Sequence, residues 1–243
     1  MKKTAIYCIA LSIIALAACS SPKKVGTESD STTQESTQKS QNNNTNKMTQ
    51  VLLKTTFGDI VIALYDDTPA HKANFEKLVN DKFYDGVLFH RIIKGFMIQG
   101  GDPDSKTAKA GQRLGSGDVG YTIPAEFVST RFHKRGAVAA ARMGDNVNPQ
   151  KASSGCQFYI VDGTVYDNDK LNMIAQRTGK TFSPAQIDAY TTVGGAPFLD
   201  GDYTVFGEVV KGMEIVDKIA EQPKDGADRP VEDIKIISAT IIQ

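Results

Sequence analysis

The stretch FHRIIKGFMIQGGD, residues Phe89 to Asp102, decides the fold of this chain. Two apolar runs lie on either side of a glycine, a pattern typical of two β-strands joined by a turn. Arg91 interrupts the first run, and Gln99 interrupts the second. Because side chains alternate between the two faces of a strand, Met97 and Gln99 share one face. The stretch therefore predicts a strand pair whose apolar surface carries hydrogen-bonding groups.

The composition is that of an ordinary globular protein and favours a turn-rich β fold. The 243 residues are 40% hydrophobic and 23% charged, and they include 21 glycines and no tryptophan. The formal net charge is zero, so the chain lacks the basic field typical of nucleic-acid-binding proteins. We therefore expect one or two domains and no nucleic-acid partner.

The first residues have the layout of a secretory signal. Lys2 and Lys3 precede an apolar run from Ile6 to Ala18, which is too short to span a bilayer comfortably. The run ends in the tetrapeptide LAAC, residues 16–19, which resembles the lipobox of bacterial lipoproteins. In such proteins the cysteine becomes the first mature residue and carries lipid.

The lipobox resemblance implies how the chain is processed and where it works. Residues 1–18 are expected to be removed as a lipoprotein signal peptide, and Cys19 is expected to be lipidated. The protein is then anchored by lipid to a membrane of the bacterial cell envelope and faces the extracytoplasmic side. Ordinary cleavage after Ala17 also fits the sequence and is the alternative.

Residues 19–49 are predicted to be a lipidated cysteine followed by a disordered tether, and residues 50–243 to be the folded domain. The tether is rich in Ser, Thr, Gln, Asn and Lys, so it cannot bury enough apolar surface to offset its ordering entropy. Cys8 leaves with the signal and Cys19 is modified, which leaves Cys156 as the single thiol. No internal disulfide is therefore expected.

The folded part is expected to contain many short strands and two isolated helices. Thr68 and Pro69 provide an N-cap and an N1 proline for a helix over residues 69–80, and a second helix is expected over 212–222. The strands are predicted at residues 51–57, 59–65, 88–93, 96–99, 137–141, 157–161, 204–209 and 233–242. This pattern indicates a closed or nearly closed β-sheet with helices over its ends.

Four motifs, in order along the chain, resemble those of the cyclophilins, the peptidyl-prolyl cis/trans isomerases. They are Phe89–Asp102, Gly136–Arg142 (GAVAAAR), Ser154–Ile160 (SGCQFYI) and Phe198–Val209 (FLDGDYTVFGEV). The resemblance extends from about Gln50 to the C-terminus. It implies a mainly β fold, a closed eight-stranded antiparallel β-barrel capped by two helices, with no cofactor and no metal.

The resemblance also implies roles for residues of these motifs. Arg91 is expected to donate to the nitrogen of the twisted Xaa-Pro amide, and Gln99 to orient Arg91 and the substrate. The residues expected to bind the substrate are Phe96, Met97, Ala141, Arg142, Gln157, Tyr159, Phe198, Leu199 and Tyr203. The implied partners are proline-containing unfolded or flexible polypeptides, and the chain is expected to be a monomer.

The chain departs from the family pattern at three positions of the expected pocket. Tyr159 stands where well-known members have Phe, Phe198 replaces the usual Trp, and Tyr203 replaces a His of eukaryotic members. A tyrosine hydroxyl in a pocket needs a hydrogen-bond partner or water. We therefore expect a slightly altered substrate preference rather than a loss of activity.

An insertion at residues 163–197 is the larger departure. Helices are expected at 168–177 and 184–192, and Ser183 before a proline is a helix-start signal. The insertion lies between the strand at 157–161 and the last motif, so we expect it beside the substrate groove. One interpretation is a structural excursion, and the other is a lid or an extra contact for unfolded clients.

Two other functions remain open from the sequence. A cyclophilin-like module could bind proline-containing segments as a chaperone, with little catalysis. A Cys/His hydrolase would need a base near Cys156, which the adjacent sequence lacks, so a small buried hydrophobe is the preferred interpretation.

The histidines and the glycine-rich segment give no further site. His71 is expected to be exposed on the first helix, His90 to be packed or hydrogen-bonded in its strand, and His133 to lie in a polar loop. Their spacing does not form a metal-binding pattern. Residues 101–120 are predicted to be a surface loop over the barrel, because they lack the strand–helix context of a phosphate-binding loop.

Lipidation at Cys19 can be tested by one substitution. We expect Cys19→Ala to release the protein from the membrane fraction, because the attachment site of the lipid is removed. The measurement is the distribution of the chain between membrane and soluble fractions of cells that express it. A variant that stays in the membrane fraction would contradict the lipoprotein interpretation.

Overall fold

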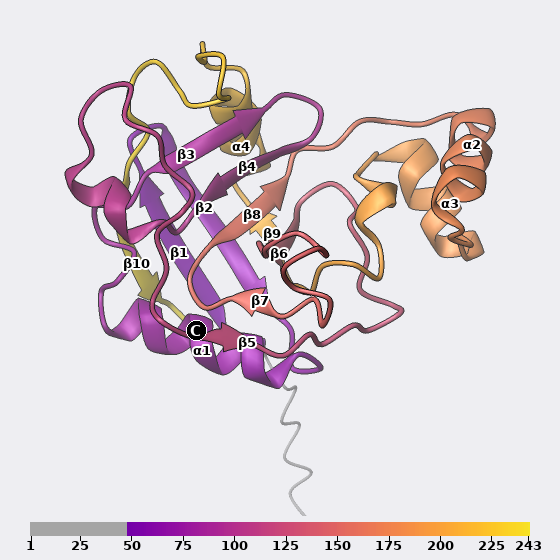
Figure 1. The fold of residues 1–243 in the computed structure, drawn as a ribbon, viewed down its shortest axis with the longest axis horizontal. Helices are drawn as coiled ribbons and strands as arrows, with labels where there is room; N and C mark the ends of the chain where they lie inside the picture. The colour runs from indigo at the N-terminus through magenta and orange to yellow at the C-terminus, as the bar shows by residue number, and fades with distance from the viewer. Residues whose placement is uncertain (1–47) are drawn as a thin grey trace, which may run out of the picture. The chain divides into compact units, whose positions relative to one another are not determined.

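The computed structural model describes residues 48–243 (Figure 1). The predicted signal peptide, Cys19 and the tether up to residue 47 lie outside the described residues. Met48 packs against buried hydrophobic residues, and the Thr49 carbonyl accepts a hydrogen bond from the Leu64 amide at 2.9 Å. The fold thus includes two residues of the segment that the sequence assigns to the tether.

The fold is built on one antiparallel sheet of eight strands. The strands follow one another in the order β10 (Ile236–Ile241), β1 (Gln50–Thr55), β2 (Gly58–Leu64), β9 (Val205–Lys211), β6 (Ala137–Ala140), β8 (Phe158–Val161), β4 (Met97–Gly100) and β3 (Phe89–Ile93). A separate two-stranded sheet pairs β5 (Thr122–Ile123) with β7 (Ser153–Ser154). The prediction of a mainly β, eight-stranded antiparallel fold is confirmed.

The two edges of the large sheet, β3 and β10, come together only near the residues at which each strand begins. Leu88 and Lys235 form an isolated antiparallel bridge just before the two strands begin. The Phe89 amide donates to the Ile234 carbonyl at 2.9 Å beside this bridge. The two strands are not paired beyond this point, so the prediction of a fully closed barrel is not confirmed.

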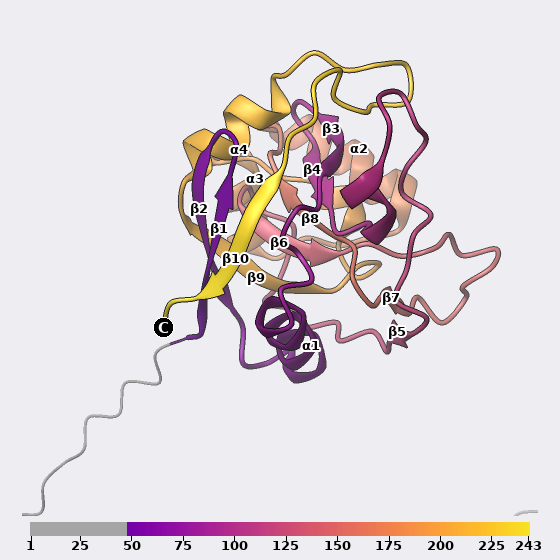
Figure 2. The same ribbon diagram turned by 90° about the vertical axis from the view of Figure 1, so that its left-hand side faces the viewer.

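Two helices cover opposite ends of the sheet, α1 (Pro69–Asn80) and α4 (Met213–Ala220), as Figure 2 shows. Thr68 occupies the N-cap position as predicted, but its hydroxyl donates to the Tyr65 carbonyl at 3.4 Å instead of capping the helix. Each helix is amphipathic because apolar residues recur at three- and four-residue spacing. The apolar residues buried under the two helices are Phe75, Leu78, Val79, Ile215, Val216, Ile219 and Ala220.

Alternation along the strands gives the sheet two apolar faces. Ile98, Val138 and Ile160 point into the main core, which also holds the aromatic rings that pack against α1. Their neighbours Met97 and Tyr159 point to the other face and form a second buried cluster. Burying one large aliphatic side chain contributes about 1.5–3 kcal/mol, so the main core fixes the sheet and leaves the second face to carry a site.

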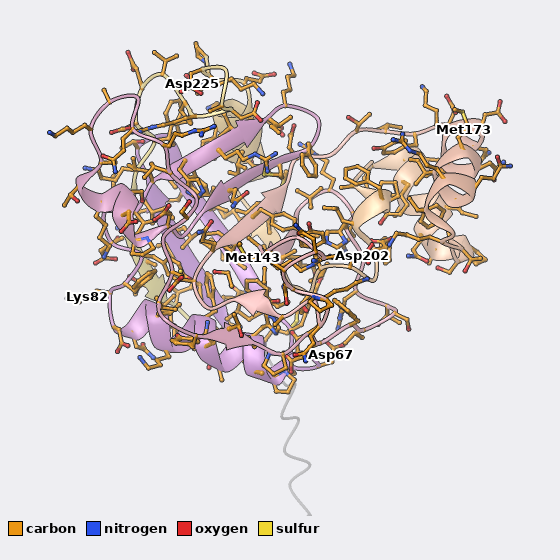
Figure 3. The ribbon with its side chains drawn as sticks, in the orientation of Figure 1. Asp67, Lys82, Met143, Met173, Asp202 and Asp225 are labelled. Carbon is orange, nitrogen blue, oxygen red and sulfur yellow. The ribbon has the colours of Figure 1, made fainter. Side chains whose placement is uncertain are left out.

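The insertion forms two helices, α2 (Asn168–Thr178) and α3 (Pro184–Thr192), as predicted (Figure 1). Helix α2 ends at Gly179, whose φ of 70° lies in the left-handed region. Helix α3 begins with a reciprocal capping box between Ser183 and Gln186. Tyr190 of α3 is fully buried, whereas Met173 of α2 is 67% exposed (Figure 3). None of the helices within residues 48–243 is long and apolar enough to cross a membrane.

Gly101, the second of two adjacent glycines before Asp102, occupies a position that no other residue fits. It follows β4, precedes the short 3-10 helix η1 (Pro103–Thr107) and has a φ of +97°. A Cβ atom at this position would lie 2.2 Å from the Cys156 carbonyl oxygen. The backbones of two neighbouring segments therefore approach each other here more closely than any side chain allows.

A matched pair of substitutions tests this close approach. Gly86 has a φ of +83° but no heavy atom within 4 Å of the added Cβ. We expect Gly86→Ala to lower the free energy of unfolding by about 1 kcal/mol from backbone strain alone, and Gly101→Ala to lower it by clearly more. Chemical denaturation measures both values, and equal losses would contradict the proposed backbone contact.

Candidate active site

Three neighbouring strands place polar side chains in one row across the sheet. Arg91 on β3 lies opposite Gln99 on β4, and Gln99 lies opposite Tyr159 on β8. Residues that are opposite in antiparallel strands project from the same face of the sheet. The row therefore lies on the face of the second cluster and not on the face of the main core.

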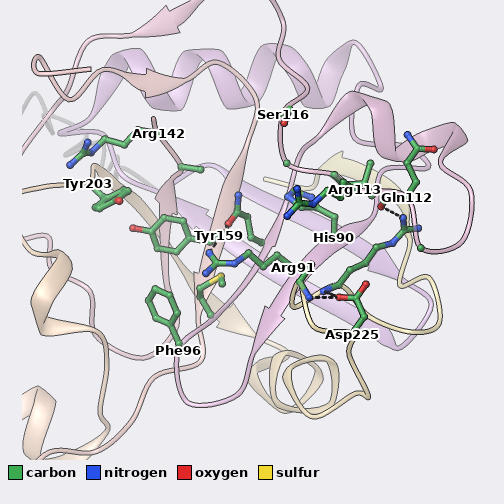
Figure 4. Close-up of a pocket in the computed structure, with 18 of the residues that line it drawn as sticks. His90, Arg91, Phe96, Gln112, Arg113, Ser116, Arg142, Tyr159, Tyr203 and Asp225 are labelled. Carbon is green, nitrogen blue, oxygen red and sulfur yellow. Dashed lines mark hydrogen bonds between the residues drawn. The ribbon is translucent and has the colours of Figure 1, made fainter. Parts of the chain in front are cut away.

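A cavity of about 510 Å³ lies over this row (Figure 4). Phe96 and Tyr159 lie on one side of Arg91 in this view, and Gln112 and Asp225 lie on the other. The predicted site residues that line the cavity are Arg91, Phe96, Met97, Gln99, Ala141, Arg142, Tyr159, Leu199 and Tyr203. The cavity thus joins an apolar part to a polar part, and the guanidinium lies between them.

Two of the predicted site residues do not line the cavity. Gln157 is 7% exposed and lies behind Gln99, with which it shares a hydrogen bond of 3.1 Å. Phe198 is 38% exposed and packs its ring against Phe96, with 5.4 Å between the ring centroids. Gln157 therefore supports the row, and Phe198 supports the apolar wall from outside.

A directed chain of hydrogen bonds holds the row. An N–H of Arg91 donates to the Gln99 side-chain oxygen at 3.4 Å, and the Gln99 amide group donates to the Gln157 side-chain oxygen at 3.1 Å. The Gln157 amide group donates to the Gly117 carbonyl at 2.8 Å and to the Gly115 carbonyl at 3.1 Å. Because an amide has one acceptor and one donor end, this order fixes the orientation of both glutamines.

Arg91 has a second partner that the sequence analysis missed. Its Nε lies 3.7 Å from an Asp228 carboxylate oxygen, and the other Asp228 oxygen pairs with Lys224 at 2.7 Å. Asp228 has a φ of 64°, an uncommon conformation for a residue with a side chain. The Arg91 side chain is still 40% exposed, so it keeps N–H groups available to the cavity. No local sequence pattern links Asp228 to a strand so far away along the chain.

The apolar part of the cavity contains a single buried hydroxyl. Tyr159 is 4% exposed, and its hydroxyl lies 2.9 Å from His133 Nε2. Burial is the main reason that the pKa of Tyr159 is raised well above its usual value, so the side chain stays a phenol. His133 lies in a loop, as predicted, but it is fully buried, which the sequence did not indicate. The His133 ring is buried because its two nitrogens form hydrogen bonds with the Asp200 carboxylate and the Tyr159 hydroxyl.

The loop at residues 111–116 lines the polar part of the cavity, which the sequence analysis also missed. Asp102 is fully buried and accepts from the Asp104 amide at 2.8 Å and from the Gly115 amide at 2.5 Å. Arg229 donates to the carbonyls of Lys109 and Gln112. The glycine-rich composition predicted a loop, and its contacts with Asp102, Arg229 and Gln157 hold it over the site.

The structure offers two places where a hydrolase could be sought, and both are unsuitable. His71 lies 2.6 Å from Glu126 and 2.9 Å from Ser153, yet His71 is 2% and Ser153 1% exposed, so no substrate reaches them. The prediction that His71 is exposed is wrong, because its helix turns this residue inward. Burial raises the pKa of Cys156 to about 11, so this buried thiol is not activated.

Comparison with known sequences decides the family. The family model for cyclophilin type peptidyl-prolyl cis-trans isomerases matches residues 50–241. The chain belongs to the cyclophilin family. The resemblance of the four motifs is therefore confirmed, and so is the enzyme class that it implies.

Two relatives of this cyclophilin chain differ in how much of their own length the match covers. A Staphylococcus aureus (strain COL) protein that carries the provisional name peptidyl-prolyl cis-trans isomerase is 33% identical over 193 residues, or 79% of this chain and 91% of the relative. A Streptococcus pyogenes protein with the provisional name bifunctional phosphatase/peptidyl-prolyl cis-trans isomerase is 37% identical over 191 residues. That match covers 77% of this chain but 37% of the longer relative.

Solved structures agree with this assignment. A Cryptosporidium parvum cyclophilin type peptidyl-prolyl cis-trans isomerase is 25% identical, with a TM-score of 0.58 over 81% of this chain and 98% of that one. A second structure of that protein, determined in the presence of the dipeptide Ala-Pro, has a TM-score of 0.57 and 24% identity. This chain therefore shares the cyclophilin fold. Its cavity lies over β4 and β8, the strands that contain residues of the first and third motifs.

No group of three or more His, Cys, Asp or Glu side chains within residues 48–243 is arranged to hold a metal ion. His90, for example, lies in the wall of the cavity, and no other His and no Cys in the described part of the chain lines that cavity. It is 4% exposed, and neither of its ring nitrogens has a hydrogen-bond partner among the described residues. The sequence interpretation of a packed strand residue is therefore confirmed.

The burial of His90 predicts a pH dependence of stability. Burial lowers the pKa of His90 from its ordinary 6.5 to about 4, although the charge of Asp102 opposes the shift. Between these two values the unfolded chain binds a proton at this residue and the folded chain does not, so stability falls as the pH falls.

We expect the free energy of unfolding to lose on the order of 3 kcal/mol through His90 between pH 7 and pH 4. Chemical denaturation of the wild type and of His90→Gln at both pH values isolates this part, because the carboxylates titrate in both proteins. An equal loss of stability in the two proteins would show that His90 does not cause it.

Proposed function

We propose that this cyclophilin accelerates cis/trans rotation about Xaa-Pro bonds, with the proline ring in the apolar part of the cavity and Arg91 beside its amide nitrogen. The observation that carries the proposal is the row Arg91–Gln99–Tyr159, which lies at the border between the apolar and polar parts of one cavity. The apolar wall consists of Phe96, Met97, Tyr159 and Leu199.

The chemistry needs only a donor in a fixed place. Amide resonance makes the bond before proline rotate slowly, and the resonance is lost in the twisted state. The nitrogen then regains its lone pair and accepts a hydrogen bond that the planar ground state accepts only weakly. A guanidinium held beside it binds the transition state better than the ground state, which is catalysis. No nucleophile, metal or proton transfer takes part in this reaction.

The partners of Arg91 suit this role. Gln99 and Asp228 hold two edges of the guanidinium without burying it, and arginine has five N–H donors in a rigid plane. A hydrogen bond to a charged group contributes about 1.5–3 kcal/mol, or roughly one to two powers of ten in rate. The apolar wall supplies the rest of the acceleration by orienting the proline and excluding water.

We also propose a location and a class of client for this enzyme. The lysine-led apolar run and the tetrapeptide that ends in Cys19 support a lipid anchor on the extracytoplasmic side of a bacterial membrane. The clients would then be exported or envelope polypeptides that contain proline and are still flexible. We further propose that the enzyme works as a monomer, because the cavity is complete within one chain.

The experiment is a prolyl-isomerisation assay on the full chain, with Arg91→Ala and a matched control. Lys94→Ala removes a cation from the turn of the same hairpin, where Lys94 pairs with Glu221 outside the cavity. We expect kcat/KM to fall about ten- to hundredfold in Arg91→Ala and to stay near the wild-type value in Lys94→Ala.

The other outcomes assign a different function. A wild-type chain that binds a proline peptide without turning it over would indicate a binding module, the chaperone-like alternative that the sequence left open. Equal activity of Arg91→Ala and the wild type would remove Arg91 from the mechanism. Thiol alkylation gives a further check, because a Cys156 hydrolase would lose its activity after this treatment and the isomerase would not.

A further inference from the structure

Several contacts join the insertion to the residues around the cavity, and one of them runs through the Asp200 carboxylate. No residue between 163 and 197 lines the main cavity, so the expectation that the insertion lies directly beside the groove is not met. The Tyr190 hydroxyl of α3 instead donates to Asp200 Oδ2 at 2.6 Å, and the Gln186 side-chain amide donates to the same oxygen at 2.9 Å. Asp200 directly follows Leu199, which lines the cavity.

The other oxygen of Asp200 binds His133. Asp200 Oδ1 lies 2.9 Å from both the backbone amide and the ring Nδ1 of His133. The ring Nε2 lies 2.9 Å from the Tyr159 hydroxyl. All members of this path are largely or fully buried: the side chains of His133 and Asp200 are 1% and 11% exposed, and Tyr190 and Tyr159 are 0% and 4% exposed. A continuous path of hydrogen bonds therefore joins helix α3 to the floor of the proline pocket.

The Asp200 carboxylate determines which His133 ring nitrogen carries a proton. The Asp200 carboxylate only accepts, so His133 Nδ1 carries a proton. A neutral imidazole accepts a hydrogen bond from the Tyr159 hydroxyl at its other nitrogen, and an imidazolium donates one to the hydroxyl oxygen, so His133 Nε2 binds the Tyr159 hydroxyl in both forms. Burial, more than the charge of Asp200, raises the pKa of Tyr190 well above its usual value, which keeps this hydroxyl a donor as well.

We propose that Asp200 is a positioning residue through which the insertion holds the Tyr159 hydroxyl turned away from the bound proline ring. This inference rests on the proposed function, and it explains how the pocket of that function binds the proline ring despite the Tyr159 hydroxyl. A tyrosine hydroxyl without a partner would hold water in the pocket, and an incoming proline ring would have to displace it. The path through His133 removes that obstacle, so the apolar pocket tolerates a tyrosine.

The two donors from α3 and a control on the same insertion test this proposal in the full chain. Tyr190→Phe and Gln186→Ala each remove one donor to Asp200 Oδ2. Tyr166→Phe removes a hydroxyl from the same insertion that has no hydrogen-bond partner within residues 48–243 and does not line the main cavity. The readouts are the ring ¹⁵N resonances of His133 by NMR, and kcat and KM for a proline peptide.

We expect Tyr190→Phe and Gln186→Ala to shift the His133 ring resonances and to raise KM about two- to tenfold, with kcat changed less than about twofold. Tyr166→Phe is expected to match the wild type in both readouts. Unchanged His133 resonances, or a KM no different from that of Tyr166→Phe, would overturn the proposal. A fall in kcat without a rise in KM would also overturn it.

Failure of the proposed function gives a different result. A wild-type chain without isomerase activity would refute that function, while the His133 resonances of the three variants would still report whether the path exists. In that case binding of a proline peptide replaces turnover as the second readout. If Tyr190→Phe destabilises the fold, Gln186→Ala decides the matter, with Ser183→Ala as its control, because Ser183→Ala breaks the same capping box and keeps the Gln186 donor to Asp200.

Discussion

The register of three strands is the constraint on which the site depends. Arg91, Gln99 and Tyr159 stand side by side only because β3, β4 and β8 pair in one alignment. A slip of one residue would turn all side chains of a strand to the other face and would place Arg91 in the main core. The register is protected by the apolar residues of that core and by the close backbone approach at Gly101.

The same alternation of side chains explains how an apolar face of the sheet can present hydrogen-bond donors without a loss of folding stability. Ile98 and Ile160 fill the core, while Met97 and Tyr159 form the second cluster on the other face. The three polar side chains that form the hydrogen-bonded chain are all partnered: Arg91 binds Gln99, Gln99 binds Gln157, and Gln157 binds loop carbonyls. An unpartnered polar group at such a place would cost about 1–3 kcal/mol.

Local patterns predicted what depends on neighbours in sequence. The hairpin around Gly95, the helix after Pro69 and both helices of the insertion are present as predicted, because period, caps and glycines act within a few residues. The four motifs contain nine predicted site residues that line the cavity, as the family resemblance implied. Two further residues of these motifs, Gln157 and Phe198, lie behind the cavity wall rather than in it.

Most of the errors concern contacts between distant segments. The helical spacing of His71 from Phe75 and Leu78 was a signal that placed it on the buried face of α1, whereas His133 meets Asp200 across 67 positions, so no local pattern reports its burial. The loop at 111–116 and Asp228 were missed for the same reason, because tertiary folding brings them to Arg91. The closed barrel was predicted from family resemblance, whereas the two edges of the sheet are joined only by backbone hydrogen bonds between residues 86–89 and 234–236.

The central claim is that the cavity over Arg91 accelerates rotation about the bond before proline. Exchange NMR of an Ala-Pro-containing peptide with a small fraction of the full chain tests this claim most directly, because it observes both isomers at equilibrium. Uncatalysed exchange takes about 10–100 s at 25 °C, so the account predicts exchange cross-peaks at sub-second mixing times only when the enzyme is present. Exchange at the uncatalysed rate, in a sample in which the peptide binds the cavity, would contradict it.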